Sequence, residues 1–200
     1  MQYINQLDYP HVKYNHNMAH GGPPEGRDTV RTSGCGLCCA SMVVDQLTDR
    51  SLPVEECVRL SEDNGASRGI GTNMKVLGTV IAARYELDFS YTNEVEEAIA
   101  HLQKGGRVVA LVAGSREGYV GLFTKSEHYI LLISYDGEEF CILDPSMTDT
   151  KFTEEGREGR VRVETPFVYA SRREVELATE AESRRYYLFS RKTNKPATEA

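Results

Sequence analysis

A cysteine lies between two glycines at the start of an apolar helix pattern, in the run Ser33-Gly34-Cys35-Gly36. The backbone N–H groups of a first helical turn are not bonded within the helix, and the helix dipole favours a thiolate there. Glycine has no Cβ, so both neighbours would leave room for a substrate backbone beside the sulfur. We predict that Cys35 is a nucleophile; the alternative is a buried structural cysteine at a tight turn.

A thiolate nucleophile needs an imidazole within hydrogen-bonding distance, and the imidazole needs an acceptor that orients it. His128 and Asp144 stand at adjacent ends of two predicted strands, which the Asp136-Gly137 turn folds against each other. In a three-residue loop that begins at Tyr135, His128 lies directly opposite Asp144. A two-residue Asp-Gly loop would instead put the two side chains on opposite faces of the sheet. The sequence therefore predicts a Cys-His-Asp site, with the hairpin register as its test.

Two other chemistries could use residues of the same region. Cys35 and Cys38 have the C-x-x-C spacing of a thiol-disulfide oxidoreductase, but no clear strand precedes them and no βαβ pattern surrounds them. His11, His16 and His20 could bind zinc, but the prolines and glycines of this segment oppose a helix that would align them. We expect neither a metal nor a cofactor. A domain that has lost activity and only binds peptides is a further alternative.

Helices followed by a sheet must position these residues. The first 34 residues form an extended, loop-rich lead-in, and apolar residues then recur at intervals of three and four in segments that begin near Gly36, Ser51, Thr72 and Asn93. Short β-branched or aromatic runs follow, and a capping pattern at Ser171 predicts a short helix among them. These runs are 107–113, 129–135, 139–143, 160–164 and 186–191. The order predicts an α+β domain with N-terminal helices packed on a C-terminal antiparallel sheet.

The composition indicates a soluble globular protein. The 200 residues carry a net charge of −7, and the pI near 5.3 argues against a nucleic-acid-binding surface. No apolar run approaches the roughly 20 residues that cross a bilayer, and the N-terminus lacks the features of a signal peptide. Five cysteines are too few for a disulfide scaffold. We expect one cytoplasmic domain over 1–192, a flexible tail over 193–200, and neither membrane nor nucleic-acid partners.

Several motifs occur in a defined order along most of the chain. They are Asn5-Gln6 with Asp8-Tyr9, Ser33-Gly34-Cys35-Gly36, Gly69-Ile70-Gly71-Thr72, His128-Tyr129-Ile130-Leu131 and Leu143-Asp144-Pro145. In order and spacing the chain resembles the bacteriocin-processing-peptidase-like family of the papain-superfamily cysteine peptidases. It departs from that family at Leu37, since members commonly have a proline soon after the glycine that follows the nucleophile.

The resemblance implies a papain-like fold and acyl transfer through a thioester, with a peptide or amide as substrate. Cys35 would be the nucleophile, His128 the general base and then the general acid, and Asp144 the acceptor that holds the imidazole. The side-chain amide of Gln6 would stand at the oxyanion hole with the backbone N–H of Cys35. Asn15 and Asn17 are alternative candidates for that amide.

Overall fold

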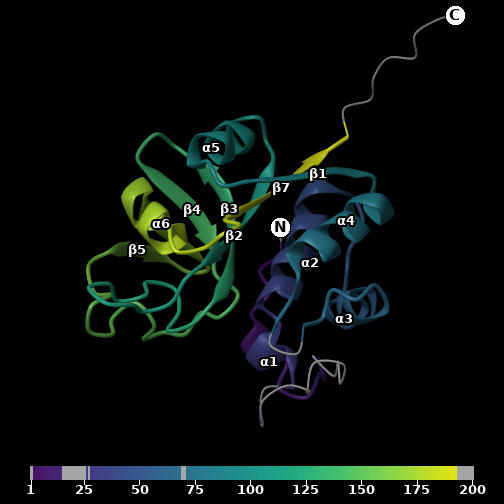
Figure 1. The fold of residues 1–200 in the computed structure, drawn as a ribbon, viewed down its shortest axis with the longest axis horizontal. Helices are drawn as coiled ribbons and strands as arrows, with labels where there is room; N and C mark the ends of the chain where they lie inside the picture. The colour runs from purple at the N-terminus through teal and green to yellow at the C-terminus, as the bar shows by residue number, and fades with distance from the viewer. Residues whose placement is uncertain (1, 15–25, 27, 69–70, 193–200) are drawn as a thin grey trace, which may run out of the picture.

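The structure is a computed structural model that describes residues 2–14, 26, 28–68 and 71–192 (Figure 1). Its helices are the 3-10 helix η1 (Gln6–Asp8) and the α-helices α1 (Val30–Ser33), α2 (Cys35–Leu47), α3 (Val54–Asp63), α4 (Met74–Tyr85), α5 (Val95–Gln103) and α6 (Arg172–Thr179). Its strands are β1 (Leu87–Thr92), β2 (Arg107–Val112), β3 (His128–Tyr135), β4 (Glu139–Leu143), β5 (Val161–Glu164), β6 (Phe167–Ser171) and β7 (Tyr186–Arg191).

The seven strands form a single antiparallel sheet in the order β1-β7-β2-β3-β4-β6-β5. Helices cover both of its faces, with α2 and α4 on one side and α5 and α6 on the other (Figure 1). Alternate strand residues face the two layers. Val109 and Leu131 pack with α2, whereas Val108 and Ile130 pack with α5. Burial on both faces explains why these strands read as uninterrupted apolar runs.

The predicted α+β class is confirmed, and most predicted elements are present within a few residues of their predicted ends. Two strands, β1 and β6, and the short helices η1 and α1 were not predicted from the sequence. In β1 the larger apolar side chains of Leu87, Phe89 and Tyr91 alternate with polar ones, which is the strand pattern. No turn sequence marks the start of β1, because a single residue separates it from α4: Glu86, which takes the left-handed conformation with φ 57°.

Both predicted registers of the β3–β4 hairpin are wrong. Tyr135 pairs with Phe140, and Asp136 Oδ1 closes the turn by accepting the N–H groups of the two following glutamates, at 2.9 and 2.8 Å. One extra residue then lies in β3 between Leu132 and Ser134, so that the pairing continues with Leu131 opposite Leu143. An inserted residue moves the side chains beyond it to the opposite face of the sheet. Because of this bulge, the first residue of β3 lies on the same face as Asp144.

Candidate active site

Cys35 is the first residue of α2, and Gly34 precedes it as the N-cap. The rest of this helix is a core element, with Leu37, Cys38 and Cys39 fully buried. Cys35 itself is half-buried and lines a cleft of about 690 Å³. The predicted position at a helix start is confirmed, and the first-turn N–H groups lie where a thiolate or an oxyanion can accept from them.

The glycines beside Cys35 have a role other than the predicted one. Both are buried, and a Cβ on Gly36 would lie 2.9 Å from Cβ of Thr72 and 3.2 Å from the ring of Tyr129. A Cβ on Gly34 would lie 2.6 Å from the carbonyl oxygen of Val30. The space beside these glycines is therefore filled by the protein. They allow α2 to pack closely against its neighbours and leave no room there for a substrate backbone.

His128 and Asp144 form the contact that the hairpin prediction required. His128 Nε2 and Asp144 Oδ1 are 2.8 Å apart, and both side chains are buried. His128 is the first residue of β3, and Asp144 directly follows β4. Since Nε2 is used by the carboxylate, the second ring nitrogen, Nδ1, is the one left to interact with Cys35, whose thiol shifts the pKa of His128 and has its own pKa shifted in return.

The charges of Cys35 and His128 are coupled. Burial alone would raise the pKa of the Cys35 thiol, but the charge and hydrogen bond of His128 and the backbone N–H groups of Tyr129 and Gly36 lower it below its ordinary value. Burial alone would lower the pKa of His128, but the charges of Asp144 and Cys35 raise it above its ordinary value. These shifts both favour a proton on the imidazole and a negative charge on the sulfur.

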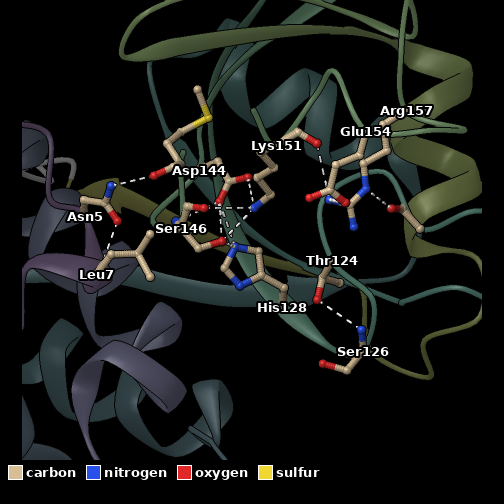
Figure 2. Close-up of polar contacts among 12 residues, drawn as sticks. Asn5, Leu7, Thr124, Ser126, His128, Asp144, Ser146, Lys151, Glu154 and Arg157 are labelled. Atoms are coloured by element: carbon tan, nitrogen blue, oxygen red, sulfur yellow. Dashed lines mark hydrogen bonds and ion pairs between the residues drawn. The ribbon is translucent and has the colours of Figure 1, made fainter. Parts of the chain in front are cut away.

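The N-terminal lead-in holds the turn that carries Asp144. The Tyr3 hydroxyl donates to the carbonyl oxygen of Asp144 at 2.6 Å, and the Gln6 N–H donates to that of Pro145 at 2.7 Å. The Asn5 amide donates to the carbonyl oxygen of Met147 at 2.9 Å (Figure 2). These contacts join segments about 140 residues apart in the sequence, and they bring the start of the chain to the cleft.

Gln6 lies in the same cleft as Cys35 and His128. Its Nε2 donates to the carbonyl oxygen of Arg31 at 2.8 Å, which leaves one N–H of the amide. Its Oε1 is buried and has no hydrogen-bond partner among the described residues. The alternative oxyanion amides, Asn15 and Asn17, lie outside the described residues.

Two polar residues at this site gave no signal in the sequence. Ser146 donates its N–H to Asp144 Oδ1 at 2.9 Å, and its hydroxyl lies 3.2 Å from both that oxygen and His128 Nε2. Lys151 donates from Nζ to Asp144 Oδ2 at 2.6 Å. The cluster they form with His128 is shown in Figure 2. A serine after a Pro turn and a lysine in a long connection are ordinary surface residues by sequence, so only the tertiary structure identifies them.

The cleft carries charges of both signs. Glu127 and Glu182 line it together with Arg68 and Arg184. The pKa of Glu182 is raised above its ordinary value by burial and by the nearby charge of Glu127. Tyr129 and Tyr187 contribute aromatic surface. The volume and mixed lining suit a flexible polar ligand such as a peptide segment.

Among the residues that the structure places, the remaining cysteines and histidines do not form a second site of this kind. Cys38 is fully buried, and burial raises its pKa well above the ordinary value, which disfavours disulfide exchange with Cys35. In the part of the chain that the structure describes, no three His, Cys, Asp or Glu side chains gather as a metal site would require. His11 is exposed, and His16 and His20 lie outside the described residues.

Comparison with known proteins gives the family. The model of the Peptidase_C39 like family matches residues 2–169, which include Gln6, Cys35, His128 and Asp144. The chain belongs to this family. The predicted resemblance is therefore confirmed, and family and fold together support a cysteine peptidase-like function.

The fold of this family member is similar to that of a solved structure. That crystal structure is of a protein from Bacillus anthracis assigned as a C39-like peptidase; the TM-score is 0.58 and the sequence identity 15%. The match covers 96% of this chain and 95% of that one. No curated protein matches the chain. No helix among the residues placed in the structure is both long and apolar enough to cross a bilayer.

Proposed function

We propose that the protein is a cysteine peptidase that cleaves a peptide or amide bond, with Cys35 as nucleophile and His128 as its acid-base partner. The observation that carries this proposal is the position of His128. It lines the same cleft as Cys35, its charge and hydrogen bonding lower the pKa of the Cys35 thiol, and its Nε2 is 2.8 Å from Asp144 Oδ1. A thiol beside an imidazole, with a carboxylate on the other side of the ring, is the arrangement that activates a thiol nucleophile.

In the acylation step, the Cys35 sulfur attacks the substrate carbonyl carbon, and the carbonyl oxygen becomes an oxyanion. The backbone N–H of Cys35 and the remaining N–H of the Gln6 amide would donate to that oxyanion. As the carbon–nitrogen bond breaks, His128 gives its proton to the leaving amine, and the acyl group remains on the sulfur as a thioester. Asp144 holds the imidazole throughout.

In the second step, His128 removes a proton from water, and the resulting hydroxide attacks the thioester carbonyl. The acid product leaves, and the sulfur becomes a thiolate again beside the protonated imidazole. A second amine could take the place of water, and the reaction would then be a transpeptidation. Both reactions use the same three side chains.

The competing proposal of thiol-disulfide exchange is less well supported. Its second thiol would be Cys38, which is fully buried and whose pKa is raised well above the ordinary value. That proposal also gives no role to the buried pair of His128 and Asp144.

Cleavage of a mixture of fluorogenic peptides tests the proposed function. We expect Cys35→Ala and His128→Ala each to lower cleavage by about a thousandfold or more, because the nucleophile and its base act as a unit. Cys141→Ala is the matched control, since Cys141 is a half-buried thiol on β4 outside the cleft, and it should retain wild-type cleavage. Cleavage that survives in Cys35→Ala would contradict the proposal. Dependence on Cys38 but not on His128 would favour the oxidoreductase.

A further inference from the structure

The oxygen of Asp144 that His128 does not use is bound by a buried lysine. Asp144 Oδ1 accepts from His128 Nε2, whereas Oδ2 accepts a bond of 2.6 Å from Lys151 Nζ. The same ammonium donates to Ser146 Oγ at 2.6 Å, and this hydroxyl lies 3.2 Å from His128 Nε2. Figure 2 shows these four side chains converging. A single hydroxyl therefore separates the lysine charge from the imidazole.

Lys151 is an unusual lysine because only 6% of its surface is exposed. Removing an ammonium group from water is unfavourable unless oxygen atoms replace the lost water. Asp144 Oδ2, the Ser146 hydroxyl and, at 3.3 Å, the Ser146 carbonyl oxygen replace it here. Within the described part of the chain, the oxygen partners of this ammonium all belong to the turn that orients His128.

A second buried cation fixes the backbone of Lys151. Arg157 is 4% exposed, and its Nη1 donates to the carbonyl oxygen of Lys151 at 3.4 Å. Arg157 Nε donates to the carbonyl oxygen of Gly121 at 2.8 Å, and Glu154 Oε2 lies 3.3 Å from its Nη1 (Figure 2). The position of the ammonium is therefore set by two loops that are tied together.

Lys151 and the imidazolium of His128 are the cations that act on Asp144 among the described residues. The other described ionisable groups around the cluster are Cys35, Cys38 and Cys39 of α2, Tyr3 and Asp8 of the lead-in, and the Arg157–Glu154 pair. Burial raises the pKa of Tyr3, Cys38 and Cys39, which keeps these three groups neutral near neutral pH. Burial would also raise the pKa of Asp144, but the charges of Lys151 and then His128 hold it well below its usual range.

We propose that Lys151 is a positioning residue. It keeps Asp144 and Ser146 in place beside His128, and its charge reduces the electrostatic stabilisation that Asp144 gives to the imidazolium. This inference rests on the proposed function. A cation on the far oxygen of a carboxylate reduces the stabilisation that the carboxylate gives to an imidazolium, so the imidazolium becomes a stronger acid. His128 would then transfer its Nδ1 proton more readily to the leaving amine as the carbon–nitrogen bond breaks.

The titration of the His128 imidazole, followed by NMR, tests this role. Lys151→Met removes the charge and keeps much of the side-chain volume, and we expect it to raise the midpoint of His128 by about one pH unit. Lys104→Met, at an exposed lysine after α5, is the matched control and should leave the midpoint unchanged. Lys151→Gln also removes the charge but keeps a donor, and it gives the same reading if Lys151→Met does not fold. An unmoved midpoint in a folded Lys151 variant would overturn the proposal.

Two further measurements separate this inference from the proposed function. Cys35→Ala removes the thiolate, so the His128 midpoint should fall relative to the wild type; an unmoved midpoint there would contradict the ion pair itself. With a peptide that the wild type cleaves, Lys151→Met should lower kcat about tenfold and change KM less than about twofold. If Lys151 had a purely structural role, its substitution would leave the His128 midpoint unchanged and would not lower kcat more than it changes KM. That result would also overturn the inference.

Discussion

At the scale of the residue, some groups of the candidate site can be predicted from the sequence and others cannot. Cys35, His128 and Asp144 could be predicted because each stands at the end of an element with a clear pattern. Lys151 could not, because nothing in its neighbourhood distinguishes it from an exposed lysine. Its burial depends on contacts with Asp144 and on the Arg157 bridge between two loops.

Gln6 offers a prediction at this scale. Its remaining amide N–H is proposed to stabilise the oxyanion, and Gln6→Ala should therefore lower kcat by about a hundredfold while KM changes little. Steady-state kinetics on a cleaved peptide would measure both constants. Gln2→Ala, at an exposed glutamine of the same segment, is the matched control. Wild-type kcat in a folded Gln6→Ala protein would exclude Gln6 from the oxyanion hole.

At the scale of the element, the sequence predicts the helices well and the hairpin register poorly. The predicted three-residue loop would have placed His128 opposite Asp144 directly, whereas the structure reaches the same contact through a longer turn and a bulge after Leu132. A bulge has no strong sequence signature, so the register could not be derived from the Asp136-Gly137 turn alone. The edge strand β1 was missed because it follows α4 without a turn sequence of its own.

Gly36 gives a prediction for the packing of α2. An alanine at an open position of a helix would stabilise it by up to about 1 kcal/mol relative to glycine. At Gly36 the added Cβ would lie 2.9 Å from Cβ of Thr72, so we expect Gly36→Ala to lower the free energy of unfolding by about 1–3 kcal/mol instead. Urea denaturation measures this difference. An increase in stability would show that the contact between α2 and the Thr72 segment is looser than the structure has it.

At the scale of the whole molecule, the cleft forms where three distant parts of the chain meet. The lead-in contributes Gln6, α2 contributes Cys35, and the start of β3 contributes His128, while Asp144 after β4 is buried behind the imidazole that it binds. The prediction of helices on one sheet is confirmed, but α5 and α6 also cover the second face, since both faces of the central strands are apolar. A single domain over 1–192 stays a prediction, and the predicted tail over 193–200 lies outside the described residues.

The buried charges predict how stability depends on pH. The pKa of Asp144 is well below its usual range in the folded protein, so Asp144 stabilises the fold above about pH 4, and this contribution is lost as the pH falls toward the folded-state value. The double variant Asp144→Asn with Lys151→Met removes both charges of the pair. Between about pH 5 and pH 2, its free energy of unfolding should fall less steeply than that of the wild type. Equal slopes in thermal or urea unfolding would contradict the depressed pKa of Asp144.

The coupling of Cys35 to His128 is the central claim, and the pH dependence of Cys35 alkylation by iodoacetamide tests it most directly. We expect the wild-type thiol to react selectively at a pH well below the ordinary cysteine range, since the imidazolium stabilises the thiolate. In His128→Ala this reaction should disappear at low pH and return only as the uncoupled thiol ionises. Identical rate profiles of Cys35 alkylation in the two proteins would contradict the account.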